Sequence, residues 1–291
     1  MKHQTASRTA QYMALFRAVE TKRPKVKRLF DDQYAINFLD TGLQKVVKLS
    51  ALPFFRNFIP KLIHKKGLGA ISSGIARTKY IDDLLKRAVE TGTKQVIILG
   101  AGFDVRSLRL EFLKNLSVIE IDHPDTSNYK LNILKKSGRL LPSNVSFHQA
   151  DFNKQSLNEI SEQAKIDFSL PTTIIWEGVT NYLTANAIDN TFEFTKKFNS
   201  LLTIIFTYID KDVLENPDHF KGTEKLFTNL KENEEQWTFG FSPNELGNYL
   251  QQFHLTLAED LNATEYRNRY ISERKGILDG YEFYRVAIAE R

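Results

Sequence analysis

Carboxylate side chains recur along the middle of this sequence, each directly after a short apolar segment. Asp104 follows the run QVIILGAGF, Asp122 follows SVIEI, and Asp151 and Glu177 follow two further strand-like segments. Runs of Val and Ile of about this length are typical of buried parallel strands. Parallel strands end at one edge of a sheet, where open α/β folds bind their ligands. The spacing therefore predicts a ligand site lined by acids.

The first of these segments, QVIILGAGFDVR, is the most informative. Gly100, Ala101 and Gly102 follow the strand, and glycine lets the backbone turn sharply and approach a cofactor closely. A dinucleotide fingerprint would need a third small residue where Val105 stands, and no Gly-Lys-Ser/Thr of a P-loop follows. The acid at Asp104 suits a ligand with a cationic end, such as S-adenosylmethionine. Taken alone, the motif is equally compatible with a plain connection from a strand to a helix.

The acids at the next strand ends extend this interpretation toward a nucleoside. Asp122 lies about 20 residues past the glycines, where a carboxylate accepts hydrogen bonds from the ribose hydroxyls. Asp151 and Phe152 form a pair that can bind the adenine amino group and stack on its ring, although Asp151 could equally be a helix N-cap. Glu177 and Gly178 end the fourth strand. Together these residues favour a nucleoside cofactor over a purely structural turn.

The elements that must position these residues alternate between strands and helices. A helix at 72–89 leads into the first strand. The predicted strands are 95–99, 116–121, 144–148, 172–176, 201–208, 254–258 and 282–289, and the predicted helices between them are 107–114, 124–136, 185–198 and 243–252. This order predicts an α/β fold with a seven-stranded, mostly parallel sheet, an antiparallel last strand and helices on both faces.

Two further parts of the chain lie outside this alternation. Residues 1–70 are expected to form an N-terminal helical cap, with helices at 5–20 and 31–49 and an aromatic, proline-bracketed segment at 52–60 that packs against another part of the protein. Residues 210–241 are expected to form a lid insertion, helical over about 212–235, in the Rossmann-like core 71–291. We expect 1–291 to be a single domain.

Composition and charge restrict the classes of function. The 291 residues include no cysteine, which excludes disulfides, thiolate catalysis and cysteine-ligated metals, and we expect no metal site. No apolar run is long enough to span a membrane, so we expect a cytoplasmic protein with no membrane partner. Residues 1–66 contain 14 Lys and Arg against 4 Asp and Glu. Their densest part, 22–28, is more simply a solvated segment than a nucleic-acid surface, and we expect no nucleic-acid partner.

Taken in order, the motifs resemble the leucine carboxyl methyltransferase superfamily, and within it bacterial S-adenosylmethionine-dependent O-methyltransferases. The resemblance extends from about residue 5 to the end of the chain. The matching pieces are S-x-T-A-x-x-x-A-x-x-R-A-x-E at 7–20, LFDD at 29–32, ART at 76–78, LGAGFDVR at 99–106, EIDHP at 120–124, DF at 151–152 and EGVTNYLT at 177–184. Phe103, Val105 and His123 depart mildly from the residues that are commoner in the family.

The resemblance implies a class I methyltransferase, Rossmann-like fold with S-adenosylmethionine as cofactor. It also implies roles for individual residues. Arg77, which taken alone would be a surface charge, would bind the methionine carboxylate. The other implied cofactor-binding residues are Gly100, Ala101, Gly102 and Asp104 around the methionine part, Asp122 and His123 at the ribose, Asp151 and Phe152 at the adenine, and Glu177 and Gly178 at the end of the fourth strand.

The implied reaction is methyl transfer to a carboxylate or hydroxyl oxygen, for which we expect a small-molecule acceptor. A carboxylate needs no general base, whereas a hydroxyl would use one, and the candidates are Tyr182, nearby acids, His123 and, less favoured, His148. Acceptor contacts are expected from the N-terminal helices, residues 212–241 and the loop at Asn181. The alternatives are carboxyl methylation of a protein C-terminus and an NAD(P)-dependent oxidoreductase. The sequence does not indicate the oligomeric state.

Overall fold

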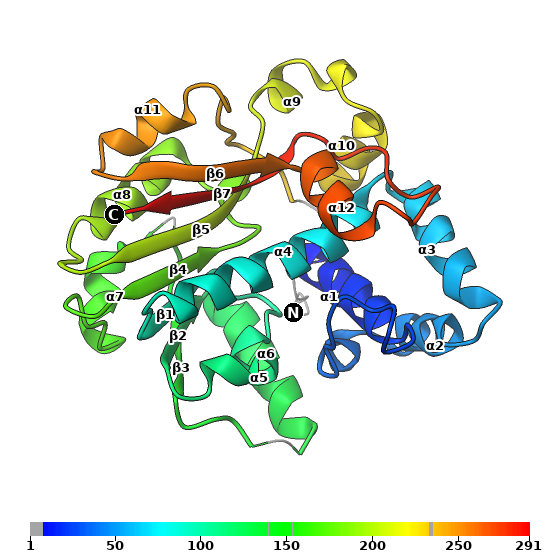
Figure 1. The fold of residues 1–291 in the computed structure, drawn as a ribbon, viewed down its shortest axis with the longest axis horizontal. Helices are drawn as coiled ribbons and strands as arrows, with labels where there is room; N and C mark the ends of the chain where they lie inside the picture. Colours follow the sequence, from blue (N-terminus) through cyan, green and yellow to red (C-terminus); the bar gives the residue numbers. More distant parts are fainter. Residues whose placement is uncertain (1–7, 139, 153, 233–234) are drawn as a thin grey trace.

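A seven-stranded sheet forms the centre of the computed structural model, which describes residues 8–138, 140–152, 154–232 and 235–291 (Figure 1). Its strand order is β3-β2-β1-β4-β5-β7-β6. The strands are β1 (Gln95–Leu99), β2 (Ser117–Asp122), β3 (Val145–Gln149), β4 (Thr172–Trp176), β5 (Leu202–Ile209), β6 (Thr256–Asn262) and β7 (Tyr284–Glu290). The first five are parallel, and β7 runs antiparallel to both β5 and β6. The predicted fold class is confirmed.

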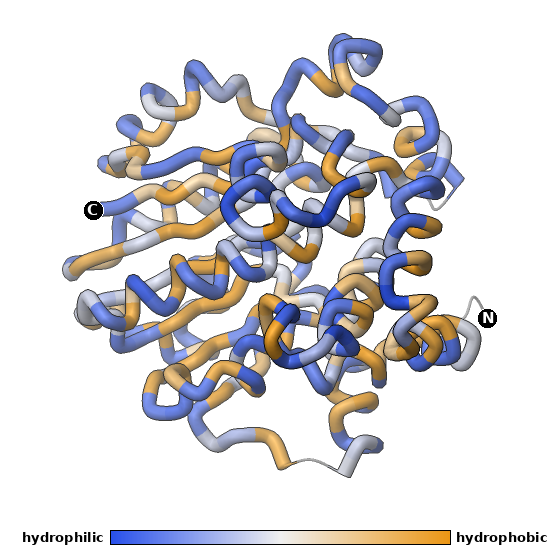
Figure 2. Tube along the Cα trace, turned by 45° about the vertical axis from the view of Figure 1, so that its right-hand side comes forward, coloured by the Kyte–Doolittle hydropathy of each residue, from blue (hydrophilic) through white to orange (hydrophobic). Residues whose placement is uncertain are grey.

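Helices cover both faces of the sheet. On β1, Ile97 and Leu99 point to one face and Val96 and Ile98 to the other, and all are buried. Burial on both faces explains why this strand is continuously apolar rather than alternating. The helices on the first face are α7 (Leu157–Gln163), α8 (Ala185–Thr195) and α11 (Leu246–Gln251), and those on the second are α4 (Ala70–Glu90) and α12 (Ala263–Ile271). Along the helices hydrophilic and hydrophobic residues alternate, as expected for one buried face (Figure 2).

The N-terminal helices lie beside the carboxyl ends of the parallel strands, at the right of Figure 1. They are α1 (Arg8–Thr21), the 3-10 turn η1 (Ala35–Phe38), α2 (Thr41–Ser50) and α3 (Phe55–Lys66). Phe16 of α1 packs with Ile71 and Ile75 of α4 in one buried cluster. At Gly74 the two helices approach so closely that an added Cβ would lie 2.8 Å from the Phe16 ring. The cap is thereby fixed against the first helix of the core.

Several predicted helices differ from the observed ones. The helix expected at 31–49 is wrong, because the Asp40 side chain accepts a hydrogen bond from Leu43 N and so starts α2 as a separate helix. The helix expected at 107–114 is only a single turn, α5 (Arg106–Arg109), followed by the 3-10 turn η2 (Glu111–Leu113). By contrast, α6 (Pro124–Lys136) has the predicted bounds, which Pro124 sets at the first position.

The lid insertion also differs from expectation, whereas the aromatic segment meets it only in part. The helix predicted over 212–235 is broken into α9 (Asp212–Glu215), the 3-10 turn η4 (Pro217–His219) and α10 (Thr223–Glu232), and α12 was not predicted. The segment 52–60 was expected to pack against another part of the protein. It forms the start of α3 and packs there through the buried Ile59 and Pro60, whereas Phe54 and Phe58 are 79% and 52% exposed. Among the described residues, no helix is long and apolar enough to cross a membrane.

Candidate active site

A cavity of about 930 Å³ lies between the carboxyl ends of the parallel strands and the N-terminal cap. This volume is at the upper end of the range for ligand pockets. The predicted cofactor-binding residues all line it: Arg77, Gly100, Ala101, Gly102, Asp104, Asp122, His123, Asp151, Phe152, Glu177 and Gly178. The structure therefore brings together residues from the ends of four strands and from α4 around one space.

The glycine turn forms one wall of the cavity. Gly100 and Gly102 have φ values of +62° and +47°, a left-handed conformation that favours glycine. At Gly100 an added Cβ would also lie 2.3 Å from Val179 Cγ2. The turn is followed by the single-turn helix α5. The backbone of the turn itself faces the site.

Asp122 is fixed directly beside this turn. Its Oδ2 accepts a hydrogen bond of 2.7 Å from Gly102 N, and its Oδ1 accepts one of 2.8 Å from His123 N. Burial raises the pKa of Asp122, although the two backbone N–H groups oppose this effect. A carboxylate oxygen can accept more than one hydrogen bond, so both oxygens retain capacity for ligand hydroxyls.

A buried network of arginines and acids underlies the other wall. Glu177 accepts a hydrogen bond of 2.8 Å from Arg77 Nε at one oxygen and one of 2.7 Å from Arg106 Nη1 at the other. Arg106 also pairs with Asp82 at 2.8 Å and with Asp104. Each charge has a partner of opposite sign, which buried charges require. The network holds Glu177 and Asp104 at the cavity in fixed orientations.

The network also sets the charge state of its members. Burial raises the pKa of the Glu177 carboxyl, but the charges of Arg106 and Arg77 outweigh this and lower it. In the same way Arg106 overcomes the effect of burial and lowers the pKa of Asp104 to about 2. Burial disfavours the Arg77 charge, and interactions with Tyr284 and Glu177 raise its pKa overall. Both acids are therefore ionised at neutral pH.

Arg77 is buried at the cavity, so its interpretation as a surface charge is wrong. Its guanidinium lies 4.4 Å from the centre of the Tyr284 ring, and its Nη2 donates to Met13 Sδ at 3.2 Å. A thioether is a weak acceptor, so this edge of the arginine is poorly satisfied compared with the edge that faces Glu177. An anionic group of a ligand would be a stronger partner than Met13.

Arg17 is a residue of the site that sequence reasoning missed. Its Nη2 donates to the carbonyl oxygen of Phe103 at 2.6 Å, and its Nε donates to Asp32 at 2.8 Å. Arg17 thus joins α1 to the glycine turn. It belongs to the matching piece at 7–20, but its partner Phe103 is 86 residues away, and spacing along the chain gave no indication of the contact.

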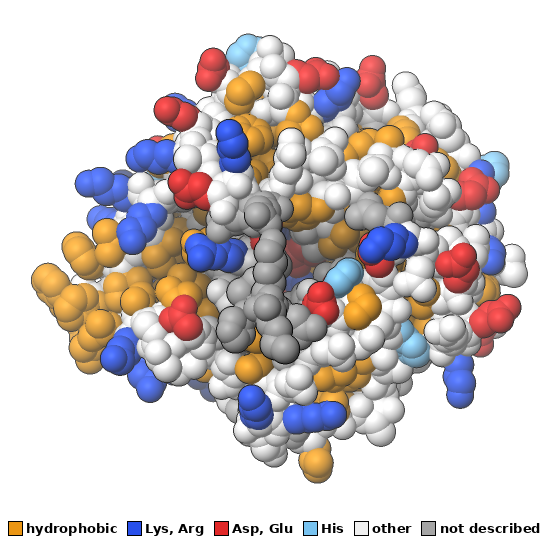
Figure 3. All heavy atoms as spheres, turned by 180° about the vertical axis from the view of Figure 1, so that it is seen from behind, with side chains coloured by type: hydrophobic (Ala, Val, Ile, Leu, Met, Phe, Trp, Pro, Cys, Tyr) orange, Lys and Arg blue, Asp and Glu red, His pale blue; other side chains and the backbone are white. Residues whose placement is uncertain are grey.

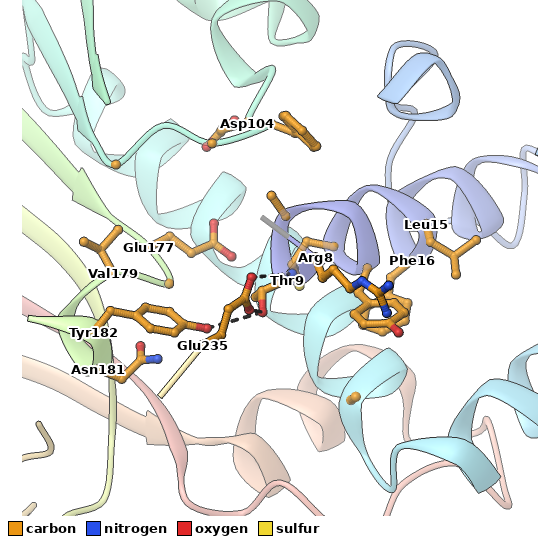
Figure 4. Close-up of a pocket in the computed structure, with 18 of the residues that line it drawn as sticks. Arg8, Thr9, Leu15, Phe16, Asp104, Glu177, Val179, Asn181, Tyr182 and Glu235 are labelled. Carbon is orange, nitrogen blue, oxygen red and sulfur yellow. Dashed lines mark hydrogen bonds between the residues drawn. The ribbon is translucent and has the colours of Figure 1, made fainter. Parts of the chain in front are cut away.

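The other end of the cavity is mainly apolar with one polar group of side chains. Its apolar lining includes Leu43, Val46, Ile59, Ile63, Leu226, Leu230 and Trp237. Tyr182 donates a hydrogen bond of 3.3 Å to Thr9 Oγ1, which in turn donates to Glu235 Oε2 (Figure 4). Asn181 Oδ1 is buried and has no hydrogen-bond partner in the described part of the chain. Loop 181–183, the start of α1 and the segment after α10 therefore meet at this end.

The sequence profile of the leucine carboxyl methyltransferase family matches residues 10–196. The chain belongs to this family. It is an S-adenosylmethionine-dependent methyltransferase, as expected, and membership disfavours the oxidoreductase alternative. Two bacterial relatives, from Bacillus subtilis (YktD) and Frankia alni (FRAAL3718), share the name "putative S-adenosyl-L-methionine-dependent methyltransferase". The Bacillus protein is 29% identical over a stretch that covers 72% of this chain and 69% of its own length. The Frankia protein is 30% identical over 64% of this chain and 62% of its own length.

A solved structure supports the fold independently of sequence. It is the crystal structure of a protein from Thermobifida fusca that is described as a "putative methyltransferase", with a TM-score of 0.58 over 93% of this chain and 96% of that one. Because the sequences are only 16% identical, the likeness concerns the fold alone. The Rossmann-like arrangement of the methyltransferase is confirmed by this likeness together with its own sheet order.

The candidate bases of the methyltransferase lie in different surroundings. Burial raises the pKa of Tyr182 to about 12, so at neutral pH its hydroxyl is protonated and acts as a donor. His123 is half-exposed beside Asp122, and its Nδ1 accepts from Asp125 N as the N-cap of α6. His148 lies outside the described cavity lining and contacts Ser146 Oγ at 3.1 Å. Neither histidine lies on the elements that form the acceptor end.

Proposed function

We propose that this methyltransferase transfers a methyl group from S-adenosylmethionine to an oxygen of a small, largely apolar acceptor. The observation that carries the proposal is that one cavity is lined by both sets of residues. The predicted cofactor-binding residues line one part of it, and the Tyr182–Thr9–Glu235 group lies in the apolar part. The family is described by methylation of a carboxyl group, which supports oxygen as the atom that receives the methyl.

The cofactor end offers a partner for each part of S-adenosylmethionine. Arg77 Nη2 would bind the methionine carboxylate in place of Met13 Sδ, and the ionised Glu177 would attract the ammonium group. Asp122 would accept hydrogen bonds from the ribose hydroxyls, since its orientation is already fixed by Gly102 N. The adenine would lie toward Asp151 and Phe152 at the end of β3.

When bound, S-adenosylmethionine supplies an activated methyl group, so the protein's task is mainly to position and desolvate the partners. For a hydroxyl acceptor, the O–H bond would break as its proton passes to the Glu235 carboxylate. The oxygen would form the new bond to the methyl carbon while the bond from that carbon to sulfur breaks, so that S-adenosylhomocysteine leaves. Thr9 and Tyr182 orient Glu235 through their hydrogen bonds. Asn181 Oδ1 would accept a hydrogen bond from a second polar group of the acceptor. A carboxylate acceptor would react without the proton transfer.

Calorimetric titration with S-adenosylhomocysteine, beside NADH, tests the cofactor part of the proposal. We expect saturable binding at one site for S-adenosylhomocysteine and none for NADH. Arg77→Gln should weaken binding about 10- to 100-fold, as expected for a lost charge-assisted hydrogen bond. Arg87→Gln, on the same helix but exposed, is the matched control and should bind as the unmodified protein does. Equal affinities of the two variants would contradict the assignment of Arg77.

Transfer of a labelled methyl group to a panel of acceptors tests the oxygen specificity. The panel contains apolar alcohols, phenols, carboxylic acids and amines of similar size, and a peptide that ends in leucine. We expect labelled ethers or esters of the small apolar compounds. Label on the amines alone would contradict an oxygen acceptor, and label on the peptide alone would favour the alternative of protein carboxyl methylation.

A further inference from the structure

The α2–α3 hairpin carries an unusual concentration of exposed apolar side chains. Of the nine large hydrophobic side chains that are exposed among the described residues, five belong to this hairpin: Leu49, Leu52, Phe54, Phe58 and Leu62. Figure 3 shows an orange area at its left edge, which is the side of the molecule where α2 and α3 protrude in Figure 1. Phe54, Phe58 and Leu62 are spaced four residues apart and so share one face of α3.

The same hairpin is strongly basic. Residues 41–66 contain six Lys and Arg and no Asp or Glu. Lys45 and Lys48 on α2 and Lys61 and Lys65 on α3 are exposed and adjoin the apolar side chains, and blue atoms flank the orange area in Figure 3. An apolar face bordered by lysines is typical of helices that lie in the interface of an anionic bilayer.

The hairpin also forms part of the cavity wall. Leu43 and Val46 of α2 and Ile59 and Ile63 of α3 face the acceptor end. Leu62 both lines the cavity and is 45% exposed. The exposed apolar surface is therefore continuous with the apolar lining of the acceptor site at this residue.

Two other occupants of this surface fit the observations less well. A second copy in a symmetric dimer would place the same excess of cations opposite itself, which is electrostatically unfavourable. Protein interfaces are depleted in lysine and enriched in arginine, whereas five of the six cations here are lysines. The convex, protruding shape of the hairpin suits a flat lipid surface better than a partner with a complementary groove.

We propose that the α2–α3 hairpin docks the protein on an anionic membrane surface, with Phe54 and Phe58 inserted between lipid headgroups and the lysines paired with lipid phosphates. Docking would place Leu62, which is exposed and also lines the cavity, against the bilayer, so that apolar acceptors would enter the cavity from the lipid at this residue. This second point rests on the proposed function, whereas the docking itself does not. The proposal revises the expectation that the protein has no membrane partner.

Co-sedimentation with vesicles tests the docking. The unmodified protein should sediment with mixed phosphatidylcholine and phosphatidylglycerol vesicles, should not sediment with phosphatidylcholine alone, and should be released by salt. Each lysine near an anionic surface contributes about fivefold to binding. The triple variant Lys48→Gln, Lys61→Gln, Lys65→Gln should therefore bind about 100-fold more weakly. Failure of the unmodified protein to sediment with the anionic vesicles would overturn the proposal.

Matched variants separate docking from general charge and hydrophobicity. The control is the triple variant Lys94→Gln, Lys135→Gln, Lys136→Gln, which removes the same number of exposed charges elsewhere on the protein. It should bind vesicles as the unmodified protein does. The double variant Phe54→Ser, Phe58→Ser should bind about tenfold or more weakly. The double variant Leu140→Ser, Leu201→Ser, at exposed sites elsewhere, should bind as the unmodified protein does. Both phenylalanines are exposed, so we expect the double substitution to preserve the buried packing of α3. Equal losses in hairpin and control variants would overturn the proposal.

Two further readouts distinguish the outcomes. Sedimentation velocity measures whether the protein is a dimer. A dimer that dissociates in the double variant Phe54→Ser, Phe58→Ser would assign the surface to a second copy and overturn membrane docking. Titration with S-adenosylhomocysteine in the absence of vesicles should be unchanged in all hairpin variants, because none of the substituted residues lines the cavity. We thus expect the hairpin variants to lose vesicle binding and to keep their affinity for S-adenosylhomocysteine. If the cofactor proposal is wrong, the unmodified protein will also fail to bind S-adenosylhomocysteine, whatever its binding to vesicles.

Discussion

Asp122 is a half-buried carboxylate that we propose binds the ribose hydroxyls of the cofactor, and its ionised form is the one that accepts their hydrogen bonds. Since burial raises its pKa, the carboxylate takes up a proton at a higher pH than an ordinary aspartate, whose pKa is about 3.9. We therefore expect the affinity for S-adenosylhomocysteine to be constant near neutral pH and to fall as the pH decreases through this raised pKa. Calorimetric titrations at a series of pH values, above the range of acid unfolding, measure the effect.

Substitutions at 122 and 125 identify the group responsible. Asp122→Asn should bind S-adenosylhomocysteine about 10- to 100-fold more weakly at neutral pH and should lose the pH dependence. Asp125→Asn, three residues further along and exposed, should keep both the affinity and the pH profile of the unmodified protein. A pH profile that survives Asp122→Asn would assign the titration to another group.

Glu235 is expected to accept the proton of a hydroxyl acceptor. Replacing it by glutamine preserves shape but removes this ability, so Glu235→Gln should lower kcat for hydroxyl acceptors by about 10²- to 10⁴-fold. Turnover of a carboxylate acceptor should change little, because no proton is transferred. Glu232→Gln, at the exposed end of α10, is the control. An equal loss with both kinds of acceptor would indicate that Glu235 positions the acceptor rather than takes its proton.

The contact between α1 and α4 depends on a glycine within a helix. An added Cβ at Gly74 would lie 2.8 Å from the buried ring of Phe16, whereas Gly247 of α11 has open space around it. Gly74→Ala should therefore lower the free energy of unfolding by about 1 to 3 kcal/mol. Gly247→Ala should raise it by about 0.5 kcal/mol, because alanine loses less backbone entropy. Urea unfolding of both variants measures this difference, and stabilisation by Gly74→Ala would contradict the observed packing.

The sequence predicted the strands and the residues at their ends well, because buried parallel strands are continuously apolar and their acids and glycines follow directly. It predicted the helices of the cap and the lid less well. Asp40 was read as part of a helix, although its side chain starts one. The aromatic segment 52–60 was expected to pack against another part of the protein, but the pattern did not show which of its side chains are exposed, as Phe54 and Phe58 are, because this depends on the tertiary structure.

The buried arginine network could not be predicted from spacing. Arg106 is in contact with Asp82 and Glu177, which are 24 and 71 residues away. Local patterns determine which face of a helix or strand is buried, but they do not determine which buried charges meet. The resemblance to the family supplied the role of Arg77 but none for Arg106. Contacts between residues so far apart in the sequence can be identified only once the order of the strands in the sheet is known.

The whole molecule should respond to its cofactor as one unit, because the cavity is formed by the cap, the glycine turn and residues near the lid. A ligand that binds only the folded state at about 100 times its Kd adds about 2.7 kcal/mol to the free energy of unfolding. For a chain of this size we expect S-adenosylhomocysteine to raise Tm by about 5 °C or more. Thermal unfolding with S-adenosylhomocysteine and with NADH measures this, and a rise with NADH alone would contradict the cofactor assignment.

One ion pair of the cap has a consequence for how the chain is made. Glu20 of α1 is buried and accepts two hydrogen bonds, of 2.7 and 2.9 Å, from Arg274, which is 254 residues later in the sequence. A ribosome adds about 5 to 20 residues per second, so Arg274 is synthesised roughly 13 to 50 s after Glu20. During that interval α1 can pack on α4, but the carboxylate of Glu20 has no Arg274 to neutralise it. Helix α1 thus gains this partner only after the chain between them, which includes strands β1 to β6, has been synthesised.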